Sequence, residues 1–121
     1  MRNAVEAHKW GVANQLGDIF GGWLMSNIDV AGAIEAKVCA KGNVSTVAVK
    51  ELLFLKPLFV YDLVSFYTNI EKVGKTSITV NVEVFATRMT GEEYETIKVS
   101  DATLVYVAIS KPGVKKEIPK T

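Results

Sequence analysis

One carboxylate lies in the middle of a segment that is otherwise almost entirely apolar. The segment GDIFGGWLMSNIDVAGAIEAK covers residues 17–37, and Asp29 stands between Ile28 and Val30. Burial of an unpaired carboxylate is costly and favours the protonated form, a property that suits a general base working near neutral pH. A buried aspartate is also a common structural partner of backbone groups or of a lysine. Asp29 is therefore a candidate catalytic residue, with a structural role as the alternative.

A glycine pair precedes this carboxylate at the expected start of the helix. Backbone N–H groups in a first turn have no partner within the helix, and the dipole is positive there. Amides at Gly21 and Gly22 can therefore polarise a carbonyl oxygen and stabilise the negative charge that develops on it. At 3.6 residues per turn, one stripe of the helix contains Gly22, Ser26, Asp29, Ala33 and Ala36. This spacing predicts amide donors and a carboxylate on one side of the helix, about two turns apart.

The elements that must position these groups follow from the hydrophobic period. A helix is predicted from about Phe20 to about Cys39, with Asp18 as its N-cap and Gly42 as its stop. After residue 42 the period changes to two, which predicts strands over residues 44–49, 52–55, 63–73, 76–87 and 96–109. Residues 1–10 form a further candidate strand. The alternation slips near Ser100-Asp101, which predicts a β-bulge.

Tight turns at residues 74–75 and 90–91 predict that consecutive strands pair antiparallel. A helix that is apolar on most faces needs a sheet curled around it or a second subunit over it. We therefore expect an α+β fold, with a long central helix wrapped by a curved antiparallel β-sheet. Residues 1–121 are expected to form a single domain, whose basic tail over residues 111–121 is irregular.

The composition excludes several classes of function. The 121 residues are 49% hydrophobic and 22% charged with a net charge of +1, which is ordinary for a globular domain and gives no basis for nucleic-acid binding. No apolar run is long enough to span a membrane. One histidine, His8, and one cysteine, Cys39, do not suffice for a usual zinc site. A lone cysteine and the lack of a signal-peptide pattern favour a cytoplasmic location.

The sequence also resembles a known family. The stretch NQLGDIFGGWLMSNIDVAGAIEAK, residues 14–37, resembles the hallmark segment of the YciA-type acyl-CoA thioesterases, which are hotdog-fold enzymes related to cytosolic acyl-CoA hydrolases. Four further segments match in order, namely VSTVAV, FLKPLFVYD, VGKTSITVNVEVFA and SDATLVYVAI. The resemblance covers roughly residues 14–110. Two departures are an unmatched N-terminal segment and Tyr61, which stands where the family usually has glycine.

The resemblance implies a function and an assembly. Hotdog protomers join their sheets edge to edge, and hexamers built from dimers are common. Acyl-CoA thioesters would be hydrolysed to free fatty acid and CoA at the dimer interface, with no metal and no cofactor other than the CoA of the substrate. Asn14 matches the active-site asparagine and Asp29 the catalytic aspartate, from opposite protomers. The Gly21-Gly22 turn matches the helix end that binds the thioester carbonyl.

The CoA moiety has its own candidate residues. Gly74, Lys75 and Thr76 match a region of the family that helps to bind CoA. Lys115 and Lys116 in the basic tail could meet the 3′-phosphate, or they could be solvated lysines. The segment VGKT is not a phosphate-binding loop, because a strand and not a helix follows it.

Several alternatives stay open at this point. Asp29 could act as a general base or as a nucleophile through an anhydride. A non-catalytic acyl-CoA-binding hotdog domain is the competing function, although it would not need to keep both Asn14 and Asp29. A dehydratase of the same fold would use a histidine, and none lies near this helix in the sequence.

Overall fold

The computed structural model describes residues 2–8 and 21–120, which form one α-helix and six β-strands. The helix α1 spans Gly21–Ala40, within one residue of the predicted bounds. The strands are β1 (Arg2–His8), β2 (Val44–Phe54), β3 (Leu63–Val73), β4 (Ser77–Thr90), β5 (Glu93–Lys111) and β6 (Val114–Lys115). The two short strands predicted over residues 44–55 are thus one continuous strand, β2.

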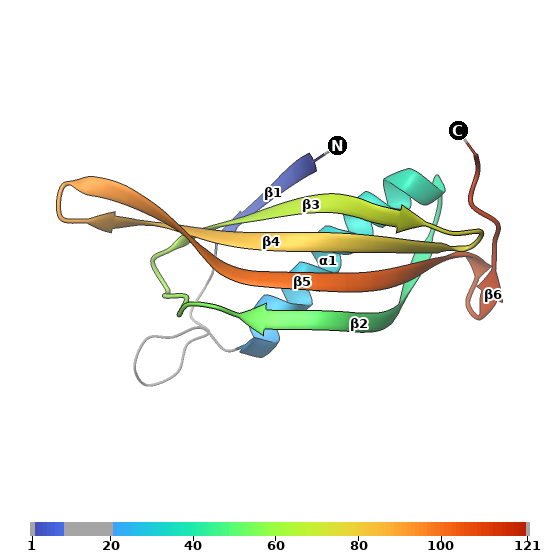
Figure 1. The fold of residues 1–121 in the computed structure, drawn as a ribbon, viewed down its shortest axis with the longest axis horizontal. Helices are drawn as coiled ribbons and strands as arrows, with labels where there is room; N and C mark the ends of the chain where they lie inside the picture. Colours follow the sequence, from blue (N-terminus) through green and yellow to red (C-terminus); the bar gives the residue numbers. More distant parts are fainter. Residues whose placement is uncertain (1, 9–20, 121) are drawn as a thin grey trace.

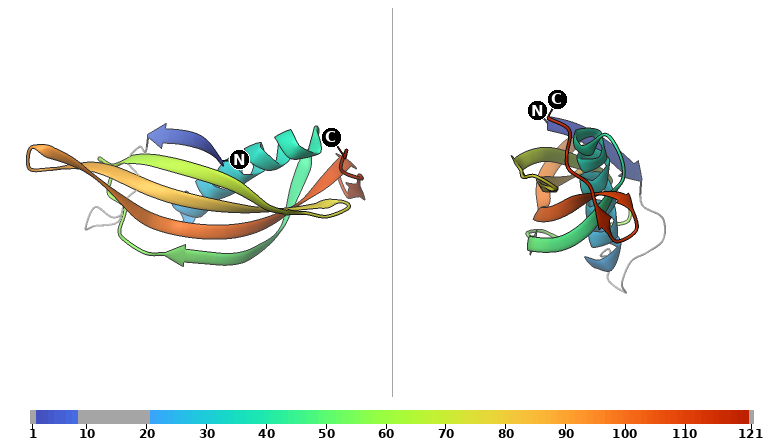
Figure 2. Two further views of the ribbon diagram at one scale, coloured as in Figure 1. Left: turned by 45° about the horizontal axis from the view of Figure 1, so that its top comes forward. Right: turned by 90° about the vertical axis from the view of Figure 1, so that its right-hand side faces the viewer.

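The strands form a single antiparallel path in the order β1-β3-β4-β5-β2, and β6 pairs with β5. The turns predicted at residues 74–75 and 90–91 join β3 to β4 and β4 to β5. Helix α1 packs on one face of this sheet and crosses its strands (Figure 1). Figure 2 shows that the sheet curves along one side of the helix. The α+β prediction, with a curved antiparallel sheet around a long helix, is confirmed.

Alternation along β4 supplies the centre of the core. Its inward residues are completely buried, as predicted: Ile78, Val80, Val82, Val84 and Ala86. They face the buried side of the helix, which includes Leu24, Ile28, Ala31 and Ala36. The apolar exception on the outer face, Phe85, contacts the edge of the Tyr67 ring at 5.5 Å between centroids. The period-two pattern therefore assigned the two faces of β4 correctly.

The helix is covered by the sheet on one side only. Val30, Ile34 and Val38 form a row at spacings of four residues, and all three are exposed in the single chain. The sheet of the same chain therefore leaves an apolar row of α1 uncovered.

Within the described residues, no helix combines the length and the hydropathy that crossing a membrane would need.

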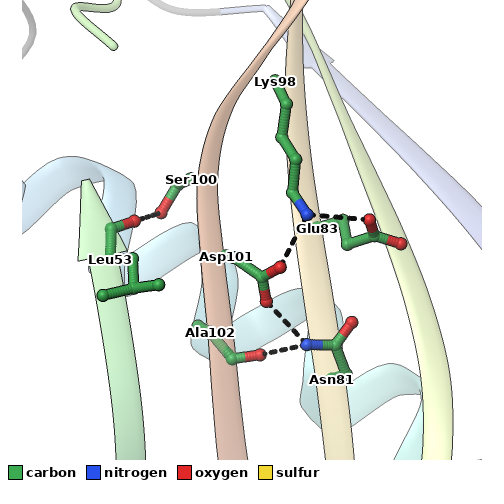
Figure 3. A network of polar contacts seen from close by, with 7 residues as sticks. All are labelled: Leu53, Asn81, Glu83, Lys98, Ser100, Asp101 and Ala102. Carbon is green, nitrogen blue, oxygen red and sulfur yellow. Dashed lines mark hydrogen bonds and ion pairs between the residues drawn. The ribbon is translucent and has the colours of Figure 1, made fainter. Parts of the chain in front are cut away.

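A bulge in β5 brings charged side chains together on the outer face. Val84 pairs with Ser100 and Phe85 with Lys98, so Val99 is the extra residue, one position before the predicted slip. The bulge puts Lys98 and Asp101 on the same face, where Lys98 bridges Asp101 at 2.6 Å and Glu83 at 3.0 Å (Figure 3). The hydrogen bond to Asp101, followed by that to Glu83, raises the pKa of Lys98. This network joins β4 to β5 at the bulge, on the face of the sheet that points away from the helix.

The predicted helix stop and the predicted irregular tail both need correction. The left-handed residue after the helix is Lys41, with φ of 55°, while Gly42 donates its N–H to the Lys37 carbonyl at 3.3 Å. The helix therefore ends at Ala40, two residues before the predicted glycine stop. The tail is not wholly irregular either, because β6 pairs with β5 and Ile118 is buried. The Ile118 N–H also donates to the Lys75 carbonyl at 2.9 Å, which ties the tail to the β3–β4 turn.

An ion pair fixes the loop between β2 and β3 to the long β4–β5 hairpin. Arg88 of β4 bonds to Asp62 at 2.7 Å, and the Asp62 side chain is only 2% exposed. The same carboxylate oxygen accepts the N–H of Phe59 at 2.8 Å, and the Arg88 guanidinium lies 4.8 Å from the Phe59 ring centroid. One buried carboxylate thus organises both the loop and its attachment.

We expect Asp62→Asn to lower the free energy of unfolding by about 2–4 kcal/mol, because it leaves Arg88 without its charged partner in a largely buried place. Urea denaturation measures this change. The matched control is Glu92→Gln, the same charge-to-amide change at an exposed turn position. Equal midpoints for the two variants would contradict the structural role of Asp62.

Candidate active site

The structure places Asp29 in the third turn of α1, partly buried, and gives it hydroxyl partners. Thr46 Oγ1 of β2 donates to Asp29 Oδ1 at 2.7 Å. Tyr106 Oη of β5 donates to the Asp29 backbone carbonyl at 2.8 Å and to Oδ1 at 3.2 Å. Across residues 21–120, no lysine or arginine pairs with this carboxylate and no hydrogen bond reaches Oδ2. Of the two structural partners considered for Asp29, backbone groups and a lysine, the lysine is therefore not found within residues 21–120.

The two hydroxyls come from neighbouring strands. Thr46 and Tyr106 are directly opposite each other in the β2–β5 pairing. The register then shifts, because Thr46 pairs with Tyr106 and Ala48 with Val105, so Val47 is an extra residue in β2. Side chains at opposed positions of a sheet project to the same face. This pairing directs both hydroxyls to the same atom, Oδ1 of Asp29 on the helix.

Tyr106 approaches the helix at Gly32, where only a glycine leaves enough room. A Cβ at Gly32 would lie 2.3 Å from the Tyr106 hydroxyl oxygen and 3.0 Å from Cζ. Neither residue was predicted from the sequence to belong to the site. A signal was present, because Tyr106 and Ser100 are the two polar side chains among the buried residues Ser100, Ala102, Leu104, Tyr106 and Ala108 of β5. A glycine inside a helix is a second signal, since it is less favourable than alanine there.

The surroundings keep the Tyr106 hydroxyl protonated. Burial of the side chain is the main cause that raises the pKa of Tyr106 above its usual range, and the nearby Asp29 charge and their hydrogen bond act in the same direction. A protonated phenol is a hydrogen-bond donor. Tyr106 therefore stays a donor to Asp29 over the whole neutral range.

The predicted amide donors, Gly21 and Gly22, lie at the N-terminal end of α1. Helix α1 begins at Gly21, and both Gly21 and Gly22 are exposed. The Phe54 ring from the end of β2 lies against Gly21, where a Cβ would approach it to 3.2 Å. Eight residues separate Gly21 from Asp29, which is about 12 Å along the helix axis. One carbonyl group cannot contact both in the same chain, so a shared site needs the helix end of a second chain.

Of the residues predicted to bind CoA, only Gly74 and Lys75 line a common groove. Gly74 and Lys75 line a groove of about 500 Å³ between the β3–β4 turn and the tail, together with Val73, Glu117, Ile118, Pro119 and Lys120. Lys120 is a second cation at this groove, and it was not predicted from the sequence. The Thr76 carbonyl accepts the N–H of Ala108 at 2.9 Å and extends the sheet.

The other predicted residues lie elsewhere. Lys115 is in β6 opposite Ile109, and the Lys116 amine lies beside Gly42 after the helix, 3.4 Å from where a Cβ would be. Neither lines the groove. Asn14 and the predicted N-cap Asp18 lie outside the described residues. Among residues 21–120, no group of three or more metal-ligating side chains comes together.

A long helix packed on a curved antiparallel sheet defines a hotdog fold, and comparisons with known proteins agree on this fold. A structure of a hexameric hotdog fold thioesterase of Campylobacter jejuni matches with a TM-score of 0.91 and 36% identity, over 96% of this chain and 89% of that one. The hexameric thioesterase of Yersinia pestis matches with a TM-score of 0.88 and 39% identity, over 97% and 94% of the two chains.

Sequence comparison gives the family. Residues 16–92 match the model of the thioesterase superfamily, and the chain belongs to that superfamily. The acyl-CoA thioester hydrolase YciA of Salmonella typhimurium is 43% identical over 107 residues, which is 88% of this chain and 80% of the relative. The resemblance in the sequence is thereby confirmed.

We predict that Tyr106 does not ionise while the protein is folded. Native wild type and native Tyr106→Phe should show the same rise in tyrosinate absorbance with pH. Because unfolded tyrosine loses its proton near pH 10 while folded Tyr106 keeps it, the free energy of unfolding should fall as pH rises above about 10. This loss should be smaller in Tyr106→Phe than in wild type. An equal loss in the two proteins would refute the assignment.

Proposed function

We propose that the protein hydrolyses acyl-CoA thioesters to a free fatty acid and CoA. The observation that carries the proposal is the Asp29 carboxylate, which is bonded by two hydroxyls at Oδ1, has no cationic partner within residues 21–120 and lies next to the edge strand β2. Membership of the thioesterase superfamily and the similarity to the Salmonella acyl-CoA thioester hydrolase support it. The same comparisons favour turnover over a non-catalytic acyl-CoA-binding domain.

The reaction needs a nucleophilic oxygen and a site for the carbonyl charge. As a general base, Asp29 takes a proton from water while the water oxygen bonds to the thioester carbon. The C–S bond then breaks, and the proton passes to the CoA thiolate. As a nucleophile, Asp29 would instead form an anhydride that water hydrolyses. A thioester is sufficiently activated that neither route calls for a metal or an organic cofactor.

The carbonyl oxygen needs donors that the same chain cannot supply at Asp29, because Gly21 lies about 12 Å and Gly22 about 10 Å away along the helix. We propose that the helix end of a second copy provides them and that Asn14 is contributed across the same interface. Strand β2 is one of the two edge strands in the described sheet and exposes Val47, Val49, Leu53 and Phe54. An unpaired edge with apolar side chains is a ready pairing surface.

The assembly proposed is a homodimer joined through β2, with three dimers in a hexamer. The Campylobacter and Yersinia relatives are hexameric, which supports this assembly. The CoA part would extend toward the groove at Gly74, Lys75 and Lys120, where two lysine cations suit its phosphates. Lys115 and Lys116 remain candidates for the 3′-phosphate. A lone cysteine, Cys39, fits a cytoplasmic enzyme.

We expect Asp29→Asn to lower kcat for acyl-CoA hydrolysis by about 10²-fold or more, which is about 3 kcal/mol of barrier, because the amide is neither a base nor a nucleophile. Released thiol, followed with a chromogenic disulfide, measures the rate. The matched control Asp101→Asn changes an aspartate on the outer sheet face and should keep the wild-type rate within about twofold. Wild-type protein that binds acyl-CoA without releasing thiol would instead establish the binding domain.

A shared site predicts complementation between inactive subunits. Asn14→Ala and Asp29→Asn proteins should each be nearly inactive, because each lacks one half of every site. After joint unfolding and refolding, about a quarter of the wild-type rate should return, since half of the randomly formed dimers are mixed and each contains one intact site. A mixture no more active than its components would place the whole site within one chain.

A further inference from the structure

We propose that Tyr106, seated against Gly32, is a positioning residue that fixes the Asp29 carboxylate for hydrolysis and leaves Oδ2 as the reacting oxygen. This inference rests on the proposed function, because it assigns the orientation of the residue that would carry the reaction. It concerns two residues, on β5 and α1, to which the sequence analysis gave no role.

The first observation is that the Tyr106 hydroxyl joins the main chain of Asp29 to its side chain. The distances are 2.8 Å to the carbonyl oxygen and 3.2 Å to Oδ1. A phenol has a single O–H, so the two acceptors share one bifurcated hydrogen bond. The carbonyl belongs to a rigid helix, and the phenol ring is completely buried in the core. The shared proton therefore holds the side-chain torsion of Asp29 relative to its own backbone.

The second observation is that both donors meet the same carboxylate oxygen. Thr46 Oγ1 donates to Oδ1 at 2.7 Å, and Tyr106 approaches the same atom from the opposite strand. Within residues 21–120, Oδ2 receives no hydrogen bond. A carboxylate held at one oxygen presents the other in a fixed direction. Oδ2 is therefore the oxygen available to water or to the thioester carbon.

The third observation is the glycine that makes this contact possible. A Cβ at position 32 would be 2.3 Å from Tyr106 Oη, 3.0 Å from Cζ and 3.1 Å from Cε2, so even alanine would displace the phenol. The backbone at Gly32 is ordinary helix, and alanine would be favoured there by about 1 kcal/mol. Space for the phenol is thus the physical reason for glycine at this position.

A purely structural tyrosine would predict something different. A buried phenol needs a hydrogen-bond partner, and the helix carbonyl alone would satisfy it. Its loss would then lower stability without changing the chemistry of the folded enzyme. A positioning residue lowers kcat at constant KM, because misdirection of the reacting oxygen affects the transition state and not substrate binding.

The test is steady-state hydrolysis of an acyl-CoA by Tyr106→Phe, with Tyr67→Phe as the matched control that loses a phenol oxygen elsewhere in the sheet. We expect kcat to fall about tenfold or more in Tyr106→Phe with KM within about twofold, and both values to stay at wild type in the control. In an Asp29→Asn background, Tyr106→Phe should have no further effect on the residual rate. A folded Tyr106→Phe enzyme with wild-type kcat would overturn the proposal.

Gly32→Ala provides a second measurement that leaves every hydroxyl in the protein. We expect it to lower kcat as well, and the double variant with Tyr106→Phe to be no slower than the slower single variant, because both act through one contact. Fully additive losses would contradict this. If Tyr106→Phe does not fold, wild-type kcat in Gly32→Ala alone is sufficient to reject the proposal.

The outcomes also separate this inference from the proposed function. Wild-type protein without hydrolytic activity, or an Asp29→Asn variant with full activity, would remove the proposed function or its catalytic residue. An active wild type, an inactive Asp29→Asn variant and an unaffected Tyr106→Phe variant would reject only the role of Tyr106.

Discussion

Two hydroxyls from opposed positions on adjacent strands hold one oxygen of the Asp29 carboxylate, and this contact joins α1 to β2 and β5. The β2–β5 register brings Thr46 and Tyr106 to the same point, and Gly32 lets the phenol reach the helix. A carboxylate partly buried in an apolar helix would otherwise be costly. Neutral donors reduce that cost without adding a positive charge beside the carboxylate that the proposed chemistry uses.

The same contact places the carboxylate beside the edge of the sheet. Thr46 lies on β2, the last strand of the order, where apolar side chains stay exposed in the single chain. The row of Val30, Ile34 and Val38 is uncovered on the helix as well. The proposed site and the uncovered apolar side chains are thus neighbours. A second copy seated on β2 would cover these side chains and bring the proposed amide donors to Asp29.

Local sequence patterns predicted most of the fold. Period-two alternation gave the faces of β4, and the turns at residues 74–75 and 90–91 gave antiparallel pairing. Errors arose where tertiary hydrogen bonds act. The tail was predicted to be irregular, but Ile118 is buried and bonds to the Lys75 carbonyl in the β3–β4 turn. Gly42 was predicted as the stop residue after the helix, but Lys41 adopts the left-handed conformation there.

The sequence by itself determined that a carboxylate would interrupt the apolar helix, that a glycine pair would open it, and that a curved sheet would follow. These are consequences of residue type and spacing, which act over one element at a time. Only the tertiary structure decided which side chains meet Asp29, because Thr46 and Tyr106 are 17 and 77 residues away along the chain. A bulge at Val47 and the strand register set that meeting, and neither can be read from local periodicity.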